Sequence, residues 1–386
     1  MIEAAQRLAD ELLAPNAERV DQASLVPSTH FEALGDAGLF GIAGRPEHGG
    51  SALPAPAARR AMAAVAGGCG ATFFVWVQHH SIVRTLTDTL DRTADPARRA
   101  ELEALLTDLA AGRRIAGTAF AHLRRAGAPA IRATRVDGGW RLDGLAPWAT
   151  SWGIAERFIV AAESADGAVV WSLIEAGPTR PLAGMTAEPL RLPVLGATGT
   201  VALRFDGCVI GDDHVVATDD AATWRRIDRV KASAGQPAPL GIAARCIGLL
   251  RGLGDDDALS AADRLAGQLD AAWAADDDVG RQLAALTTVM SEAGSRSAGG
   301  VTTDADDSIG AVIPSEAEVD AAVAVAAAHR TSALELARSA AGAHLAAVGG
   351  RGMDLDHPAQ RLAREADFYV IQAQTADGRR STLARI

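Results

Sequence analysis

Apolar residues recur at helical spacing through the first third of the chain. Leu102, Leu105, Leu106 and Leu109 fall at i, i+3, i+4 and i+7, so that four leucines share one face of a helix. Such a face has to pack against other elements to leave water. The pattern therefore predicts a helical N-terminal domain over residues 1–117.

The pattern then changes to short runs rich in β-branched and aromatic residues, with glycines between them. The runs are IRATRV (131–136), WRLDG (140–144), FIVAAE (158–163), AVVWSLI (168–174) and VALRF (201–205). Runs of this length and composition are typical of strands, and the glycines favour turns. We expect a middle β domain over residues 118–225.

Alanine- and leucine-rich helical spacing returns after residue 225 and predicts a C-terminal helical bundle over residues 226–386. Helices are expected near 239–253, 259–275, 279–293 and 316–347. The stretch 293–314, rich in glycine, serine and aspartate, predicts a mobile loop. The acidic triplets 255–257 and 276–278 are each expected between two helices, where aspartates cap N–H groups. The fold class is therefore α+β, mainly α: an N-terminal helical domain, a central β domain and a C-terminal helical bundle.

Composition narrows the class of protein. The 386 residues are 48% hydrophobic with a net charge of -11 and no basic block, which excludes a nucleic-acid-binding surface. Cys69, Cys208 and Cys246 lack disulfide or metal spacing and are expected to be buried in a reducing compartment. The N-terminus is acidic rather than signal-like, and no stretch approaches the roughly 20 apolar residues of a membrane span. We expect a cytoplasmic protein.

Three motif-like features are better explained without a ligand. The adjacent His79 and His80 have no metal-ligand partners at suitable spacing, and we expect them to pack or to line a substrate cavity. DADDSIG (304–310) has Ile309 where a calcium loop needs glycine. GGRG (349–352) follows a helical run rather than a strand, which disfavours a dinucleotide fingerprint. No metal is expected.

Four longer segments follow one another in a characteristic order. They are FEALGDAGLFGIAGRPEHGG (31–50), LLTDLAAGRRIAGTAF (105–120), APWATSWGIAERFIVAA (146–162) and LAAVGGRGMDLDHPAQRLAREADFY (345–369). In this order they resemble the landmarks of the acyl-CoA dehydrogenase family, over nearly the whole chain. The resemblance implies FAD as cofactor and an acyl-CoA or other acyl thioester as substrate. The alanine-rich run 321–345, which lets another helix approach closely, predicts a homo- or hetero-oligomer; the alternative is a position inside the chain's own helical bundle.

The segment around Trp148, Thr150 and Ser151 resembles the family's Trp-x-Thr-Ser/Asn motif. In that motif the indole covers the flavin ring and the hydroxyl reaches the flavin. The chemistry is reasonable, because a flavin needs a flat apolar cover and neutral hydrogen-bond donors at its polar edge. A tryptophan two residues before a threonine at a strand end offers both.

A second flavin-contacting segment is implied at Phe120, His122 and Leu123. AFAHLRRAGAPA (119–130) stands where the family commonly has Thr-Glu-Pro-x-x-Gly-Ser-Asp. Hydroxyl donors are therefore lost, and these three residues are expected to offer backbone atoms to the flavin.

The family's final glycine turn is matched by Gly349 and Gly350, followed by Arg361 and Arg364. In the family this turn lets the backbone approach the adenine and pyrophosphate of FAD, often that of a neighbouring subunit. The Arg-x-x-Phe-Gly motif that usually meets the partner's FAD is absent, and DRLAGQLDAAWA (263–274) stands in its place.

The family's catalytic base has no counterpart. Aligning the Arg-Asp-Ala motif carries Tyr-Glu-Gly-Thr onto residues 372–375, where Thr375 keeps the flavin-contacting threonine and Ala373 replaces the glutamate. The alternative base site falls near Ala238, where there is no carboxylate either. Removing a proton alpha to a thioester needs a positioned base, and alanine or glutamine cannot act as one.

Three functions fit this pattern. The first is an FAD-dependent oxidoreductase that acts on the CH–CH bond of an acyl thioester, with its base unidentified or lent by a partner. The second is a flavin-dependent monooxygenase-like relative, which needs no such glutamate. The third is a non-catalytic flavin-binding or flavinless subunit of a hetero-oligomer, because superfamily membership does not decide function.

Overall fold

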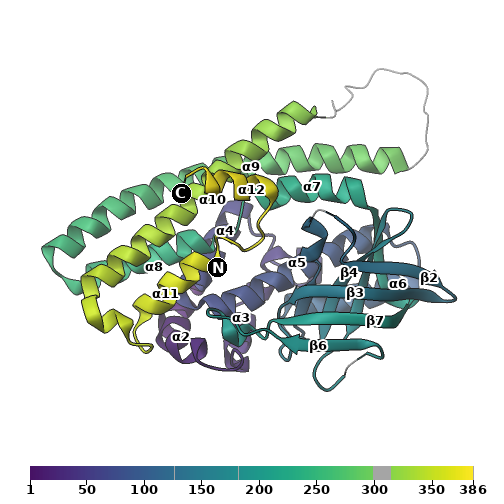
Figure 1. Ribbon diagram of the computed structural model, residues 1–386, viewed down its shortest axis with the longest axis horizontal. Helices are drawn as coiled ribbons and strands as arrows, with labels where there is room; N and C mark the ends of the chain where they lie inside the picture. The colour runs from purple at the N-terminus through teal and green to yellow at the C-terminus, as the bar shows by residue number, and fades with distance from the viewer. Residues whose placement is uncertain (126, 181, 299–313, 386) are drawn as a thin grey trace.

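The computed structural model describes residues 1–125, 127–180, 182–298 and 314–385. Figure 1 shows a twisted sheet at one end of the molecule and a helical bundle at the other. The protein is 61% helical, with helices before and after a central sheet. The predicted fold class is confirmed.

The N-terminal part of the chain is a layer of helices. They are α1 (Ile2–Leu8), a π-helical turn (Ala9–Leu13), α2 (Ala14–Asp21), α3 (Ser28–Asp36), α4 (Ala55–Gly68), α5 (Gly70–Arg92) and α6 (Pro96–Ala110). Asp95 accepts hydrogen bonds from two backbone N–H groups and caps α6. On α6, Leu102, Leu106 and Leu109 are buried and Leu105 is half-buried, as their spacing predicts.

The middle of the chain forms one sheet. Its strands are β1 (Ala116–Ala119), β2 (Ile131–Val136), β3 (Gly139–Ala149), β4 (Arg157–Ser164), β5 (Ala168–Glu175), β6 (Met185–Pro189), β7 (Val201–Gly211) and β8 (Val215–Asp220). The order is β6-β7-β3-β2-β4-β5-β8, and β1 pairs with β4. All five strands expected from the sequence are present, whereas β1, β6 and β8 were not predicted.

The sheet is held between two apolar clusters. One face places Ile159, Val169 and Trp171 against leucines and isoleucines of α5 and α6. The other face is filled by residues of β3, β7 and their neighbours, among them Leu142 and Phe205. Helix α5 therefore lies between the sheet and the rest of the helical core, and it contacts both β1 and α4.

The C-terminal part is a bundle built around α10. Its helices are α7 (Ala221–Ser233), α8 (Ala238–Leu253), α9 (Asp256–Ala298), α10 (Glu316–Val348), α11 (Pro358–Phe368) and α12 (Ala376–Leu383), with a 3-10 turn at Gly349–Met353. Helix α10 contacts α8, α9, α11 and α12, so its alanine-rich faces are used within the chain.

One expectation about this bundle was wrong. The sequence predicted two helices at 259–275 and 279–293, but α9 is continuous over Asp256–Ala298. Asp276 and Asp277, which we expected at a helix junction, instead bind Arg59 and Arg60 of α4. Two of the three aspartates are thus neutralised across the bundle, and Asp278 pairs with Arg281 of the same helix, so the triplet needs no helix end.

The other helix boundaries agree better with the sequence. Helix α8 ends at Leu253, and Asp255 accepts a hydrogen bond of 2.9 Å from the N–H of Ala258 at the start of α9. The expected loop 293–314 is in part wrong, because α9 continues to Ala298. Residues 299–313, including the rejected calcium-like segment, lie outside the described residues.

Membrane-spanning helices and metal-binding clusters were not expected from the sequence, and the described residues bear on both. Among these residues, no helix combines the length and apolarity needed to cross a membrane. No group of three or more His, Cys, Asp or Glu side chains in those same ranges is arranged to hold a metal ion. Cys69, Cys208 and Cys246 are all free and buried, as expected.

The side chains of His79 and His80 lie inside the protein, not at its surface. Both are fully buried on α5. The Nε2 of His79 donates to the carbonyl of Leu109 at 3.1 Å, and its Nδ1 accepts from the N–H of Ala116 at 3.3 Å. Burial lowers the pKa of His79 to about 4, so the ring is neutral near pH 7. It joins α5 to the end of α6 and the start of β1.

Candidate functional site

The end of β3 presents Trp148 to solvent. Ala146 pairs with Leu203 and Ala149 with Val201, so β3 has one residue more than β7 in this interval. This is a β-bulge, and Pro147 within it has no N–H to lose from the ladder. Trp148 is 39% exposed, so the chain leaves part of a large apolar side chain in contact with water.

Directly after the bulge, hydroxyl groups gather below the surface. The Oγ1 atoms of Thr150 and Thr200 are 3.3 Å apart, and those of Thr198 and Thr200 are 2.8 Å apart. Ser151 has a φ of 79°, a left-handed conformation that is costly for a residue with a side chain. Its N–H donates to the carbonyl of Thr198 at 2.9 Å.

The hydroxyl of Ser151 differs from the other hydroxyls of this cluster because it is unpaired. It is completely buried and has no hydrogen-bond partner within the described ranges of the chain. Buried polar groups are nearly always paired, so the unpaired hydroxyl and the left-handed backbone of Ser151 both carry a cost in free energy.

The segment after β1 lies beside this cluster. Strand β1 contacts β3. The two segments are so close that a Cβ on Gly117 would lie 2.7 Å from the carbonyl oxygen of Thr150. The turn at Ala121–Arg124 also contacts β3. The structure thus brings together the two segments that the resemblance assigned to the flavin, although about 30 residues separate them in sequence.

The side chains of Phe120, His122 and Leu123 are committed to packing. Phe120 meets the edge of Trp171, with ring centroids 5.4 Å apart. The Nε2 of His122 donates to the carbonyl of Ala161 at 3.0 Å, and burial lowers the pKa of this histidine. Leu123 is buried, and its N–H donates to the carbonyl of Phe120 at 3.0 Å. What these residues can offer a ligand comes from their backbone.

The glycine turn lies elsewhere. Gly349 ends α10 with a φ of 63°, and a Cβ on Gly349 or Gly350 would meet no atom within 4 Å. Open space around a backbone turn suits close approach of a ligand. In Figure 1 the connection from α10 to α11 lies at the end of the bundle remote from the sheet. One chain therefore does not bring this turn to Trp148.

The two arginines after this turn are structural. Arg361 is 2% exposed and binds Glu18 and Glu365 at 3.0 and 3.1 Å. Arg364 forms an ion pair with Asp21 at 2.5 Å. Both therefore fasten α11 to α2, which accounts for the motif without a cofactor.

The positions expected to hold the catalytic base come together in the C-terminal bundle. Ala373 lies in the turn between α11 and α12 with a φ of 46°, and Thr375 caps α12 by accepting from the N–H of Gly378 at 3.1 Å. Ala238, the alternative site, is fully buried at the start of α8. Neither position carries a carboxylate.

The turn is held by Arg330 of α10. One of its terminal nitrogens donates to the carbonyl of Ala373 at 3.1 Å and the other to the carbonyl of Gln372. Arg330 is only 6% exposed. Burial, followed by the nearby charge of Arg124, lowers its pKa to about 10, so it remains charged near pH 7.

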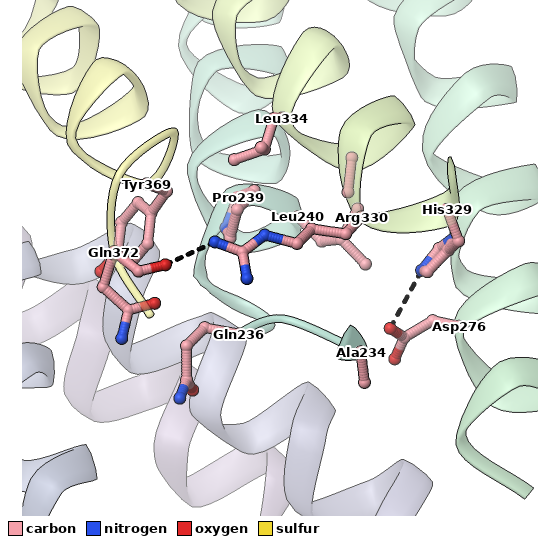
Figure 2. Close-up of a pocket in the computed structure, with 11 residues that line it drawn as sticks. Ala234, Gln236, Pro239, Leu240, Asp276, His329, Arg330, Leu334, Tyr369 and Gln372 are labelled. Atoms are coloured by element: carbon pink, nitrogen blue, oxygen red, sulfur yellow. Dashed lines mark hydrogen bonds and ion pairs between the residues drawn. The ribbon is translucent and has the colours of Figure 1, made fainter. Parts of the chain in front are cut away.

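A small pocket of about 10 Å³, with both polar and apolar lining residues, adjoins this guanidinium. It is lined by Ala234, Gln236, Pro239, Leu240, Asp276, His329, Arg330, Ala333, Leu334, Tyr369 and Gln372. Figure 2 shows Arg330 reaching across from α10 towards Gln372, with Gln236 below it and the Asp276–His329 pair on the opposite side. Pro239 and Gln372, the sequence neighbours of the two base positions Ala238 and Ala373, both line this pocket.

Arg330 was not expected at a site, and Asp276 was expected only as part of an acidic triplet between two helices. Asp276 is 3% exposed and accepts from Arg59 at 2.6 Å and from His329 at 3.1 Å. Burial alone would raise its pKa, but these hydrogen bonds lower it to about 2. Arg330 stands in an alanine-rich helix among other polar residues, and no local signal marks it as buried.

The chain is similar in sequence to known acyl-CoA dehydrogenases. Residues 1–112 match the family model described as the N-terminal domain of acyl-CoA dehydrogenase. The chain is 28% identical to benzylmalonyl-CoA dehydrogenase of Aromatoleum aromaticum over 55% of each protein. It is 24% identical to the mitochondrial 2-methylacyl-CoA dehydrogenase of Solanum tuberosum, over 99% of this chain and 88% of that one.

A solved structure shares the fold. FMN-bound dibenzothiophene monooxygenase from Paenibacillus sp. A11-2 superimposes with a TM-score of 0.73, covering 99% of this chain and 95% of that one. Sequence identity is 16%, so this likeness concerns the fold alone.

Proposed function

Because this chain belongs to the acyl-CoA dehydrogenase superfamily, we propose that it binds FAD and takes part in oxidising the CH–CH bond of an acyl thioester. The curated relatives named above act, by their names, on acyl-CoA compounds. The observation that carries the proposal is the exposed Trp148 at the end of β3, three residues before the strained backbone of Ser151.

The residues present fit a flavin. Trp148 offers an apolar face that is left in water by the chain itself, and Thr150, which is 6% exposed, follows it with a hydroxyl group, whereas the Ser151 hydroxyl is completely buried. Bound flavin would accept a hydride from the acyl chain. Gly117 helps by letting β1 lie against Thr150, so the backbone after β1 adjoins the same site.

The flavin site also favours an oligomer. The glycine turn at Gly349 and Gly350 has open space around it but lies away from the sheet. We propose that a second chain's turn meets the flavin held at Trp148.

The proton acceptor is the missing part. Ala373 and Ala238 cannot take a proton, and Asp276 is already neutralised by Arg59 and His329. We therefore propose that a partner subunit lends the base. In that case the role of this chain is to bind the cofactor and substrate and to exclude water.

A flavin-dependent monooxygenase-like function is the second candidate. It is favoured by the absence of a carboxylate at both base positions, because oxygenation by reduced flavin needs no such base. A non-catalytic partner subunit is the third, and it is favoured by the same absence together with the altered segment at 119–130.

One series of measurements separates the three functions. The purified chain is reconstituted with FAD and mixed anaerobically with a panel of acyl-CoAs, alone and with candidate partner chains from the same source. Bleaching of the flavin supports the dehydrogenase, with a partner requirement if it occurs only in the mixture. A yellow protein that does not bleach but consumes oxygen when reduced supports the monooxygenase. A colourless protein that binds no FAD at micromolar concentration contradicts the first two.

A further inference from the structure

Arg330 differs from the other deeply buried arginine in one respect. Arg361, 2% exposed, has Glu18 and Glu365 as partners, whereas Arg330, 6% exposed, has only the two carbonyls of the 372–373 turn. No carboxylate in the described ranges of the chain forms an ion pair with it. A buried charge without a counter-ion is costly, and natural proteins almost always provide one.

The neighbouring charges do not supply the missing anion. Asp276 lines the same pocket, but its carboxylate receives both Nε and a terminal nitrogen of Arg59 at 2.6 Å. Arg124, the cation that acts on Arg330, is itself paired with Asp228 at 2.7 Å. Each of these pairs is neutral, so the positive charge of Arg330 remains unbalanced at the pocket.

The pocket has the composition of an anion site. Guanidinium has five N–H donors in a planar fork that matches a carboxylate, and protein groups use two of its nitrogens here. The side-chain amides of Gln236 and Gln372, which also line the pocket, can donate as well. About 10 Å³ is the space that one water-sized group needs, which suits one carboxylate oxygen.

We propose that the pocket between Arg330, Gln236 and Gln372 binds a single carboxylate group. That group belongs either to a free small carboxylate or to the acyl substrate itself. In the second case the inference rests on the proposed function. Arg330 then selects acyl thioesters that carry an additional carboxylate, and the α11–α12 turn is ordered by the anion as well as by the arginine.

The first experiment uses formate, which needs neither flavin nor thioester. Formate binding to the purified full chain is measured by calorimetry and by the rise of Tm at constant ionic strength. Arg330→Gln should weaken binding at least 10-fold, because it removes the charge and the fork together. Arg338→Gln is the matched control: Arg338 lies on the same helix but is exposed and paired with Asp367. It should leave the affinity unchanged.

The second experiment distinguishes the source of the carboxylate. Succinyl-CoA and butyryl-CoA have acyl chains of equal length, and only the first ends in a carboxylate. If the substrate supplies the anion, succinyl-CoA binds at least 10-fold more tightly, and Arg330→Gln removes the difference. If formate binds in an Arg330-dependent way but the two thioesters bind equally, the site takes a free carboxylate.

The results that overturn the proposal are equally specific. The site would be excluded if the wild-type chain neither bound formate nor preferred succinyl-CoA over butyryl-CoA. Formate binding that survives Arg330→Gln would exclude it as well. If Arg330→Gln does not fold, Arg330→Lys keeps the charge and should retain formate binding within a few-fold. A chain that bleaches with butyryl-CoA yet ignores formate would leave the proposed function intact and refute only this inference.

Discussion

The acidic residue Asp276 offers the sharpest test of how the C-terminal bundle is held together. It is 3% exposed, and its carboxylate binds Arg59 of α4 and His329 of α10. Burial opposes ionisation, but the hydrogen bonds from His329 and Arg59 lower its pKa from the usual 3.8 to about 2. One carboxylate thus joins three helices that lie far apart in the sequence.

The contribution of this carboxylate can be worked from its pKa. A pKa of about 2 in the folded protein against 3.8 in the unfolded chain corresponds to about 2 kcal/mol of folding free energy. Because the folded pKa is the lower one, this stabilisation is complete above about pH 4 to 5. It is lost as the pH falls through 3.8 towards 2.

We expect Asp276→Asn to lower the free energy of unfolding by about 2 to 3 kcal/mol at pH 7, since it also leaves Arg59 without its charge partner. The difference from wild type should shrink as the pH falls below about 4. Asp277→Asn is the control, because Asp277 also pairs with an α4 arginine but both partners are more exposed, at 23% and 34%. It should cost less than about 1 kcal/mol.

Urea unfolding followed by circular dichroism, across a pH series, measures both variants against wild type. Equal losses in the two variants would refute the reasoning, because burial would then have no part in the effect. A loss in Asp276→Asn that does not change with pH would also contradict it, because the source of the stability would not be the ionised carboxylate.

Three further outcomes are expected. Trp148→Ala should lower FAD occupancy, read from the flavin absorbance of purified protein, more than it lowers the stability of the flavin-free protein. Unfolding with flavin retention unchanged would make Trp148 a core residue. Gly117→Val should lower the free energy of unfolding in urea by at least about 2 kcal/mol, because its Cβ would lie 2.7 Å from the Thr150 carbonyl. The control Gly248→Ala should be tolerated, because its added Cβ would meet no atom within 4 Å. Ala373→Glu should speed anaerobic flavin reduction by acyl-CoA, within the 10²- to 10⁴-fold range typical of general bases. Arg330 beside this turn should keep the pKa of the new carboxylate low, so the gain should persist at mildly acidic pH; no gain with any acyl-CoA would contradict the alignment.

Local patterns in the sequence predicted much of the fold. The leucine face of α6 and the five β-branched runs each carry their own periodicity, and each became the expected element. Trp148, Thr150 and Ser151 could be proposed because they are adjacent in an ordered series of segments. By contrast, β1 is the four-residue run AGTA, buried at every position, and it has no alternation to read.

The buried charged residues could not be predicted from the sequence, because their partners lie far away along the chain. Asp276 stands 217 residues from Arg59, and without that partner an acidic triplet looks like a helix end rather than the middle of α9. In the sequence Arg330 looks like any other polar residue, because the turn that it binds lies 43 positions later. Periodicity fixes which residues form a helix or strand, because those interactions are local. Burial of a single charge is decided only when separate elements close around it, and that is a property of the tertiary structure.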